Sequence, residues 1–277
     1  MNNQIKTVLL LGLLTGILLG IGSYWGYSGL IIGLVFAVCI NFGSYFFSDK
    51  IVLRMYKAKE ADEKDYPALY RVVRDVVHLA HVPMPKVYVI KSDNLNAFAT
   101  GRNPEHAVVA CTEGIIKVLS KDELKGVLAH ECGHVKNRDI LISTIATTIA
   151  TVIGYLAMMA KWSAIFGIGG RDRNNNLFGL LAVAIITPII AMIIQMAISR
   201  SREYLADYAG AKVVGSGESL ARALEKLESH NKAHPMRFGS TSTAHLFISN
   251  PFGKISSLLS THPKTSERCR KLREMTF

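Results

Sequence analysis

The sequence predicts an α+β protein that is mostly helical, with a small β-sheet, attached to a membrane unit of four predicted transmembrane helices. Of the 277 residues, 49% are hydrophobic and only 19% are charged, whereas soluble globular chains carry about 25% charged residues. The apolar residues concentrate in four long runs, and the remainder shows helical spacing and short β-branched stretches. The four Cys have no paired spacing. We therefore exclude a disordered or a disulfide-stapled protein.

The formal net charge of +11 raises the question of a polyanionic partner. The basic excess is spread along 200–277 without a basic run or interleaved aromatic residues. This distribution argues against nucleic-acid binding. It favours a lipid bilayer, with anionic headgroups, as the partner of the chain.

Two apolar runs, Val8–Trp25 and Gly29–Phe47, predict an N-terminal transmembrane hairpin over residues 1–47. Each run is close to the roughly 20 residues that a helix needs to cross the hydrocarbon core. A removable signal peptide fits the first run poorly, because a second run follows with no clear cleavage site between them. Lys6 precedes the hairpin and Lys50 follows it, so the positive-inside rule places both ends in the cytosol.

Two further apolar runs, Ile140–Ala160 and Leu177–Ile198, predict two more membrane helices with a connecting loop over residues 140–199. Basic residues before the third run and after the fourth favour this topology. Arg171 and Arg173 in the loop argue mildly against its translocation. A helical pair buried in a soluble core remains the alternative for these two runs.

The segments 48–139 and 200–277 are then exposed to water on the same side of the membrane. Ser120 with Glu123 three residues later forms a capping-box pattern, which predicts the start of a helix. The spacing of apolar residues predicts helices over 66–80, 121–136, 217–228 and through Glu203, and strands over 86–90, 96–100 and 107–111.

The helix predicted over 121–136 carries a pattern of metal-binding residues. His130 and His134 lie one turn apart on one face, so their ring nitrogens can converge on a single ion. Glu131 lies beside them, where it can reach a metal-bound water. Much later in the chain, Glu203 can supply a third, carboxylate ligand. Asp207, one turn on, can accept the N–H of a ligating His and fix its tautomer.

Three protein ligands leave the fourth position of a zinc ion for water, which is typical of catalytic zinc. The ion lowers the pKa of the water and polarises a substrate carbonyl, while Glu131 acts as the general base. Amide hydrolysis is the reaction that this arrangement suits best.

Motifs along most of the chain make it similar to the HtpX-type membrane zinc endopeptidases, relatives of the CAAX-prenyl protease Ste24. They are the hairpin, the HExxH helix, Asn96–Gly101, Ser201–Asp207, Thr243–Ile248, Asn250–Pro251 and Ser260–Pro263, with Arg268 behind them. The resemblance implies a gluzincin-like zinc protease domain, formed by 48–139 and 200–277 and facing the cytoplasm from a bacterial inner membrane. It also implies ATP-independent cleavage of misfolded or damaged membrane proteins, in protein quality control and the stress response.

Carried over to this sequence, the resemblance makes His130, His134 and Glu203 the ligands of one zinc ion per chain, with Glu131 as the base. His262 and Arg268 match positions suspected of stabilising charge in the transition state. A donor aimed at the oxyanion is physically sensible, but a structural role in the tail is an equal alternative.

The resemblance also makes the segment Asn96, Ala97, Phe98 and Ala99 the edge strand on which a peptide substrate aligns. An exposed strand edge offers main-chain N–H and C=O groups to any extended backbone, which suits broad specificity. An ordinary short edge strand is the alternative interpretation.

Three residues close to the motif are expected to have structural roles. Cys132 follows Glu131 and should point away from the His face into the core. Asn137 and Asp139 are expected to cap and solvate the end of the helix.

Two other functions were weighed against a protease. A catalytically inactive membrane scaffold that binds unfolded segments should have lost a ligand or the base, and this sequence retains all of them. A transporter or channel should carry ionisable groups inside its membrane spans, and the four apolar runs contain essentially none.

Overall fold

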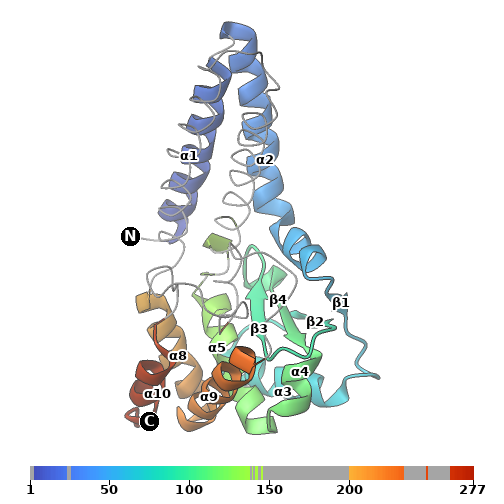
Figure 1. Ribbon diagram of the computed structural model, residues 1–277, viewed down its shortest axis with the longest axis vertical. Helices are drawn as coiled ribbons and strands as arrows, with labels where there is room; N and C mark the ends of the chain where they lie inside the picture. Colours follow the sequence, from blue (N-terminus) through green and yellow to red (C-terminus); the bar gives the residue numbers. More distant parts are fainter. Residues whose placement is uncertain are drawn as a thin grey trace. The chain divides into compact units, whose positions relative to one another are not determined.

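The computed structural model describes residues 3–23, 26–137, 139, 141–142, 145, 200–233, 248 and 263–277. The chain divides into two compact units, one of residues 1–44 with 145–197 and one of residues 45–144 with 198–277. The first unit holds α1 and most of the apolar part of α2, and the second holds the sheet and the other described helices (Figure 1).

The N-terminal hairpin consists of α1 (Asn3–Ser23) and α2 (Gly26–Met55). The two helices approach closely, since a Cβ at Gly33 would lie 2.7 Å from the carbonyl oxygen of Leu18. They also share a hydrogen bond, because Asn41 Nδ2 lies 2.9 Å from the hydroxyl of Thr15 on the facing helix.

Of the described helices, one is long and apolar enough to cross a membrane, over residues 26–47 of α2. The apolar stretch of α1, Thr7–Ser23, is shorter. The third and fourth apolar runs, 140–160 and 177–198, lie almost wholly outside the described residues. The two membrane helices and the loop expected over 140–199 therefore remain predictions.

α2 continues for about two turns beyond residue 47, where the hairpin was predicted to end. Val52, Leu53 and Tyr56 give this extension an apolar face, which packs on the sheet. The expected boundary at residue 47 therefore falls inside one continuous helix.

A four-stranded sheet in the order β1-β2-β4-β3 forms the centre of the second unit (Figure 1). β2 and β4 are parallel, while β1 and β3 are each antiparallel to their one neighbour. Among the described residues β3 pairs only with β4, so it is an edge strand of the described sheet. The strands are β1 (Lys59–Glu60), β2 (Lys86–Ile90), β3 (Ala97–Thr100) and β4 (Val108–Thr112). The three strands expected from the sequence are confirmed to within one residue at each end, and β1 was not predicted.

Both faces of the sheet are covered, and the alternation of side chains along each strand decides which residues face which layer. Tyr88, Ile90, Phe98 and Val108 point towards the α2 extension. The alternate residues, among them Val87, Ala97, Ala99 and Val109, point into the main core with α3 (Pro67–Ala80), α5 (Lys121–Lys136) and α9 (Glu218–Ala233). Burial on both sides explains why the strands are almost continuously apolar.

The other described helices surround the sheet. They are α3 (Pro67–Ala80), α4 (Glu113–Val118), α5 (Lys121–Lys136), α8 (Arg200–Val214), α9 (Glu218–Ala233) and α10 (Thr265–Arg273), with a short 3₁₀ turn, η1 (Pro104–His106). The helices expected over 66–80 and 121–136 are confirmed, whereas α4 and α10 were not predicted. The helix expected over 217–228 runs on to Ala233, because Asn231 is buried and binds both the N–H and the C=O of Leu95.

The predicted capping box starts α5 and also ties it to a neighbouring helix. Ser120 accepts a hydrogen bond from the N–H of Glu123, and Glu123 accepts one from the N–H of Ser120 at 2.8 Å. The same carboxylate oxygen of Glu123 lies 2.8 Å from Lys226 Nζ of α9. α5, which carries the HExxH motif, is therefore fixed at its N-terminus by a local cap and by a contact between helices.

Candidate metal centre

The centre depends on a close approach between α5 and α8. A Cβ at Gly210 of α8 would lie 2.7 Å from the backbone nitrogen of His130, so only glycine permits this spacing. Glu203 and Asp207 lie one turn apart on α8 and therefore face the histidines of α5 at short range.

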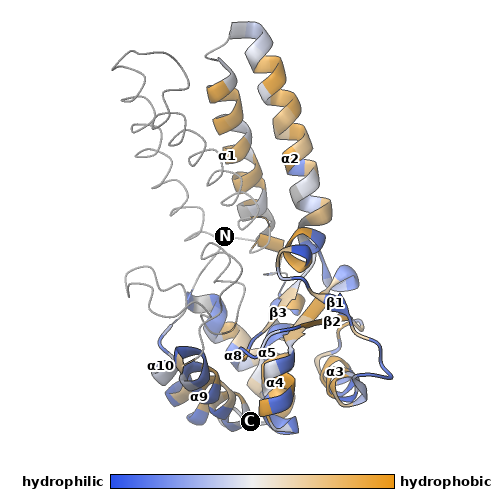
Figure 2. Ribbon diagram, turned by 45° about the vertical axis from the view of Figure 1, so that its right-hand side comes forward, coloured by the Kyte–Doolittle hydropathy of each residue, from blue (hydrophilic) through white to orange (hydrophobic). Residues whose placement is uncertain are grey.

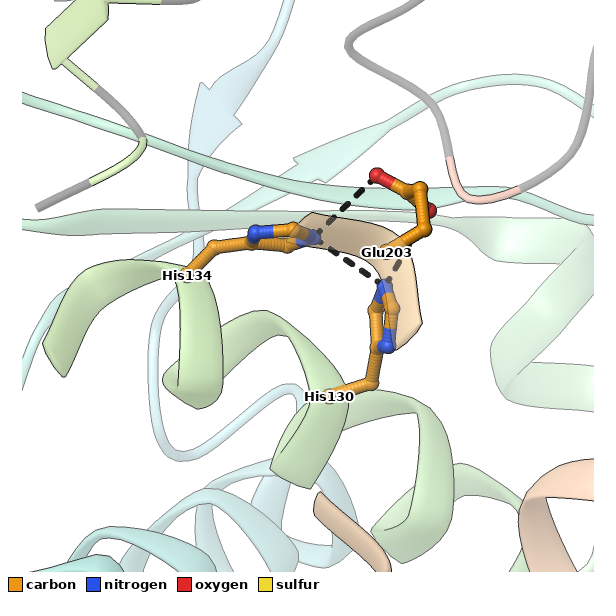
Figure 3. A group of neighbouring side chains, drawn as sticks. All are labelled: His130, His134 and Glu203. Atoms are coloured by element: carbon orange, nitrogen blue, oxygen red, sulfur yellow. Dashed lines mark hydrogen bonds and ion pairs between the residues drawn. The ribbon is translucent and has the colours of Figure 1, made fainter. Parts of the chain in front are cut away.

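His130, His134 and Glu203 converge as the sequence predicts (Figure 3). The two Nε2 atoms are 3.2 Å apart. Glu203 places Oε1 3.6 Å from His134 Nε2 and Oε2 3.8 Å from His130 Nε2. Ligands about 2.0–2.1 Å from a tetrahedral ion are about 3.3 Å apart. The three side chains therefore fit a small divalent cation.

The buried charges also fit a divalent cation. Glu203 and three further carboxylates are buried at the site with two guanidiniums: Glu131, Asp139, Asp207, Arg202 and Arg268. Among the described residues the carboxylates outnumber the guanidiniums, which favours a cation. The nearby carboxylates also affect His134. Burial alone would lower the pKa of His134, but its hydrogen bond to Asp139 and the charge of Glu203 raise this pKa to about 9.

Asp207 lies behind His130, as predicted, and is itself held by an arginine. Its Oδ1 lies 2.9 Å from His130 Nδ1. Arg268 of α10, only 2% exposed, donates from Nε and Nη2 to the two carboxylate oxygens of Asp207 at 2.8 and 2.6 Å. Burial would raise the pKa of Asp207, but Arg268 and His130 lower it to about 2. Asp207 therefore stays ionised as a fixed acceptor.

A matching pair lies behind His134, and the sequence interpretation missed it. Asp139 is 4% exposed and accepts a hydrogen bond at 3.3 Å from His134 Nδ1. Arg202 Nη1 lies 3.8 Å from the other oxygen of Asp139. The expectation that Asp139 is solvated is therefore wrong, because a His on one side and an Arg on the other compensate for its burial. Asn137, by contrast, is exposed and is the C-cap of α5.

Glu131 is 4% exposed and lies next to the edge strand. Its Oε2 accepts the N–H of Ala99 at 2.8 Å. Burial raises the pKa of Glu131 to about 7. A carboxyl group whose pKa is near neutrality is suited to take up and release a proton at physiological pH.

The edge of β3 that faces away from β4 lies beside Glu131, and all four residues of the strand are buried. Thr112 donates its N–H to the C=O of Asn96 at 2.9 Å, so Asn96 and, by alternation, Phe98 bond to β4. Ala97 and Ala99 then direct their N–H and C=O groups to the open edge, as the Ala99 bond to Glu131 requires. Asn96 is fully buried, and its side-chain amide has no hydrogen-bond partner within the described part of the chain.

Two other sequence expectations concern single side chains. Cys132 is 3% exposed and belongs to the main core, as expected, and burial raises its pKa to about 12. His262 lies outside the described residues, so its suspected role remains a prediction.

Comparison with known proteins identifies the family of this chain. Residues 63–276 match the description Peptidase family M48. A protein named Protease HtpX homolog from Syntrophobacter fumaroxidans is 53% identical over 283 residues, which cover 99% of this chain and 100% of that protein. A second protein of this name, from Thermococcus kodakarensis, is 48% identical over 98% of this chain and 95% of its own length.

The fold is also similar to a solved structure. The crystal structure of Ste24p from S. mikatae aligns with a TM-score of 0.54 and 20% sequence identity. The alignment covers 98% of this chain and 65% of that longer chain. At this identity the likeness concerns the fold alone.

Gly210→Ala is expected to weaken both folding and metal binding. On helix propensity alone, Gly→Ala inside a helix stabilises by about 1 kcal/mol. Here the new methyl group would push α8 away from the backbone of His130. The melting temperature and the affinity for added zinc, measured by chelator competition, should both fall. The matched control is Gly12→Ala in α1, where a Cβ meets nothing within 4 Å. A rise in melting temperature for Gly210→Ala would contradict the close packing.

Proposed function

The chain belongs to peptidase family M48, as a metallopeptidase, and we propose that it is a membrane-embedded, zinc-dependent endopeptidase that cleaves misfolded or damaged membrane proteins. The observation that carries this proposal is the convergence of His130, His134 and Glu203, whose donor atoms lie within 4.8 Å of one another, beside the buried Glu131. Zinc is the proposed ion because two imidazoles and one carboxylate are typical ligands of catalytic zinc.

The proposed mechanism assigns a task to each part of the site. When bound, the ion supplies Lewis-acid polarisation of a water molecule and of the scissile carbonyl. Glu131 takes a proton from the attacking water and returns it to the leaving amine. The N–H of Ala99 holds one oxygen of Glu131, which orients the carboxylate towards the substrate.

Two buried pairs support the ligands from behind. We assign Asp207 and Arg268 to the orientation of His130, and Asp139 and Arg202 to the orientation of His134. A carboxylate on the distal nitrogen of a ligating His fixes the tautomer and raises the basicity of the ligand. The contacts of Arg268 favour this positioning role over direct contact with the substrate.

Substrate binding is assigned to the edge of β3. The N–H and C=O of Ala97 and the C=O of Ala99 can pair with an extended peptide, whereas the N–H of Ala99 is bonded to Glu131. Main-chain pairing ignores side chains and requires an unpaired backbone. This selectivity suits the removal of unfolded segments. From the charge pattern and the family resemblance, we assign this cleavage to the cytosolic face of a bacterial inner membrane. An inactive scaffold would not need the base and all three ligands.

Glu131→Gln is expected to abolish proteolysis while leaving the ion in place. Gln keeps the size and the acceptor for Ala99 but cannot take a proton, so kcat should fall by about 10²–10⁴-fold. The measurement is cleavage of an unfolded membrane protein by the detergent-purified full chain, before and after chelation and zinc return. Asp122→Asn, at an exposed position on the same helix, is the control and should keep its activity. Full activity in Glu131→Gln would refute the mechanism.

Ala97→Pro is expected to impair substrate binding without unfolding the protein. The substitution removes an N–H that points to the open edge, a position where strands tolerate proline. KM should therefore rise, whereas the circular dichroism spectrum and zinc content should stay unchanged. Phe98→Pro is the matched comparison, because it removes an N–H bonded to β4 and should destabilise the sheet. If Ala97→Pro left KM unchanged, the edge would not be the peptide site.

Asp139→Asn tests the pair that the sequence interpretation missed. The affinity for zinc should fall by about 10–100-fold, as is typical when an outer carboxylate is removed. Asp207→Asn should show a loss of similar size. Chelator competition measures the affinity independently of activity. A lower melting temperature with unchanged zinc affinity would assign Asp139 to stability alone.

A further inference from the structure

One helix connects the apolar span to the sheet of the protease unit. α2 contains the apolar stretch 26–47 and continues to Met55 without interruption. Figure 2 shows the orange of apolar residues along α2, with charged residues in blue near its C-terminal end. Beyond the span, Val52 and Tyr56 pack on the same face of the sheet as Phe98 of β3.

β3 and the residues after it contact the C-terminal part of α2 in two places. The ring of Phe98 lies 5.8 Å from that of Tyr56, and the guanidinium of Arg102 lies 5.5 Å from the ring of Phe46. From Phe46 to Met55 the chain is helical and rises about 14 Å. β3 ends at Thr100 and Arg102 lies in a bend, so Phe98 and Arg102 are at most about 13 Å apart. The chain from Phe98 to Arg102 therefore contacts α2 near its C-terminal end and again at Phe46, at the end of the span.

The contact between Phe46 and Arg102 has the composition of a membrane interface. Phe46 and Phe47 end the apolar span and are 39% and 44% exposed. Lys50 Nζ lies 5.2 Å from the ring of Phe47, a second cation–π pair beside that of Arg102. Aromatic rings with lysine and arginine are typical of the level of the lipid headgroups. This composition favours the level of the lipid headgroups for Phe46 and Arg102.

The catalytic base lies a short way along the same strand. Glu131 accepts the N–H of Ala99, and Ala99 is three residues from Arg102. Three extended residues span at most about 10 Å. A peptide paired with the edge of β3 would lie along α2, with one end at the level of the headgroups. A substrate segment that leaves the membrane in extended form would have the same position.

We propose that α2 and β3 act as a ruler, so that the enzyme cuts the extended segment directly adjoining a transmembrane helix of its substrate. The expected cut lies about three to five residues beyond the headgroup boundary. This inference rests on the proposed function and specifies its substrate: the unfolded juxtamembrane segment of an integral membrane protein. Phe46 and Arg102 at one end of the ruler, and Ala99 and Glu131 at the other, belong to one compact unit.

The test uses the full chain, loaded with zinc in lipid vesicles, and a substrate with one transmembrane helix and a long tail of identical repeats. Identical repeats remove any sequence preference, so the mass of the membrane-retained stub reports distance alone. We expect stub ends to peak about three to five residues from the span. Stub ends spread evenly along the tail would overturn the ruler.

Two variants change the contact between Phe46 and Arg102 and leave the catalytic groups unchanged. Arg102→Gln removes the cation and Phe46→Leu removes the ring, so each should broaden the peak and move it outwards. Lys117→Gln, which removes an exposed charge from α4, is the control and should leave the peak unchanged. A peak that stays unchanged in both Arg102→Gln and Phe46→Leu would also overturn the proposal.

A soluble unfolded peptide separates this proposal from the proposed function. All three variants should cleave it at the wild-type rate. If the wild type cuts the peptide but leaves evenly distributed stubs, the ruler fails and the protease stands. If the wild type cuts neither substrate, both proposals fail.

Discussion

The pairing of buried carboxylates with buried guanidiniums is the interaction on which the centre depends. Asp207 can face His130 from a site that excludes water because Arg268 binds both of its oxygens. A carboxylate buried without such a partner would take up a proton and stop accepting from the imidazole. Arg268 reaches Asp207 from α10, the last helix of the chain. The geometry of the ligands therefore depends on the folding of the C-terminal segment against α8.

The same constraint links metal binding to stability. Without a cation, the described carboxylates of the site outnumber its described guanidiniums in a medium of low polarity, which opposes folding. Binding a metal removes this repulsion, so part of the binding free energy becomes folding free energy. The close approach at Gly210 works in the same direction, because helices held at this distance leave the ligands little room to move apart. Metal content and resistance to unfolding should therefore change together in this chain.

The sequence predicted best the features that are local. α5 was predicted residue by residue, because the capping box and the apolar spacing that define it lie within one segment. The two histidine ligands followed from a one-turn spacing, and Glu203 from its place in a second short segment with Asp207 one turn on. Features that depend on distant partners were missed. Asp139 was expected to be solvated because its partner Arg202 lies 63 positions away in the chain. The apolar span of α2 ends at residue 47, as expected, but the continuation of the helix to Met55 was not predicted, because Val52 and Tyr56 gain their apolar partners only from the folded sheet.

The arrangement of β3 has a consequence for the proteins on which such an enzyme acts. A site that pairs with main chain has little to read in any side chain, so point substitutions in a substrate give it little protection. What protects a substrate is the time its segments spend folded. When opening and closing are fast, cleavage follows the equilibrium population of the open form, and a loss of stability of 1–2 kcal/mol changes the abundance of a protein several-fold. An edge strand of four residues would in this way convert small differences in folding free energy into differences in lifetime.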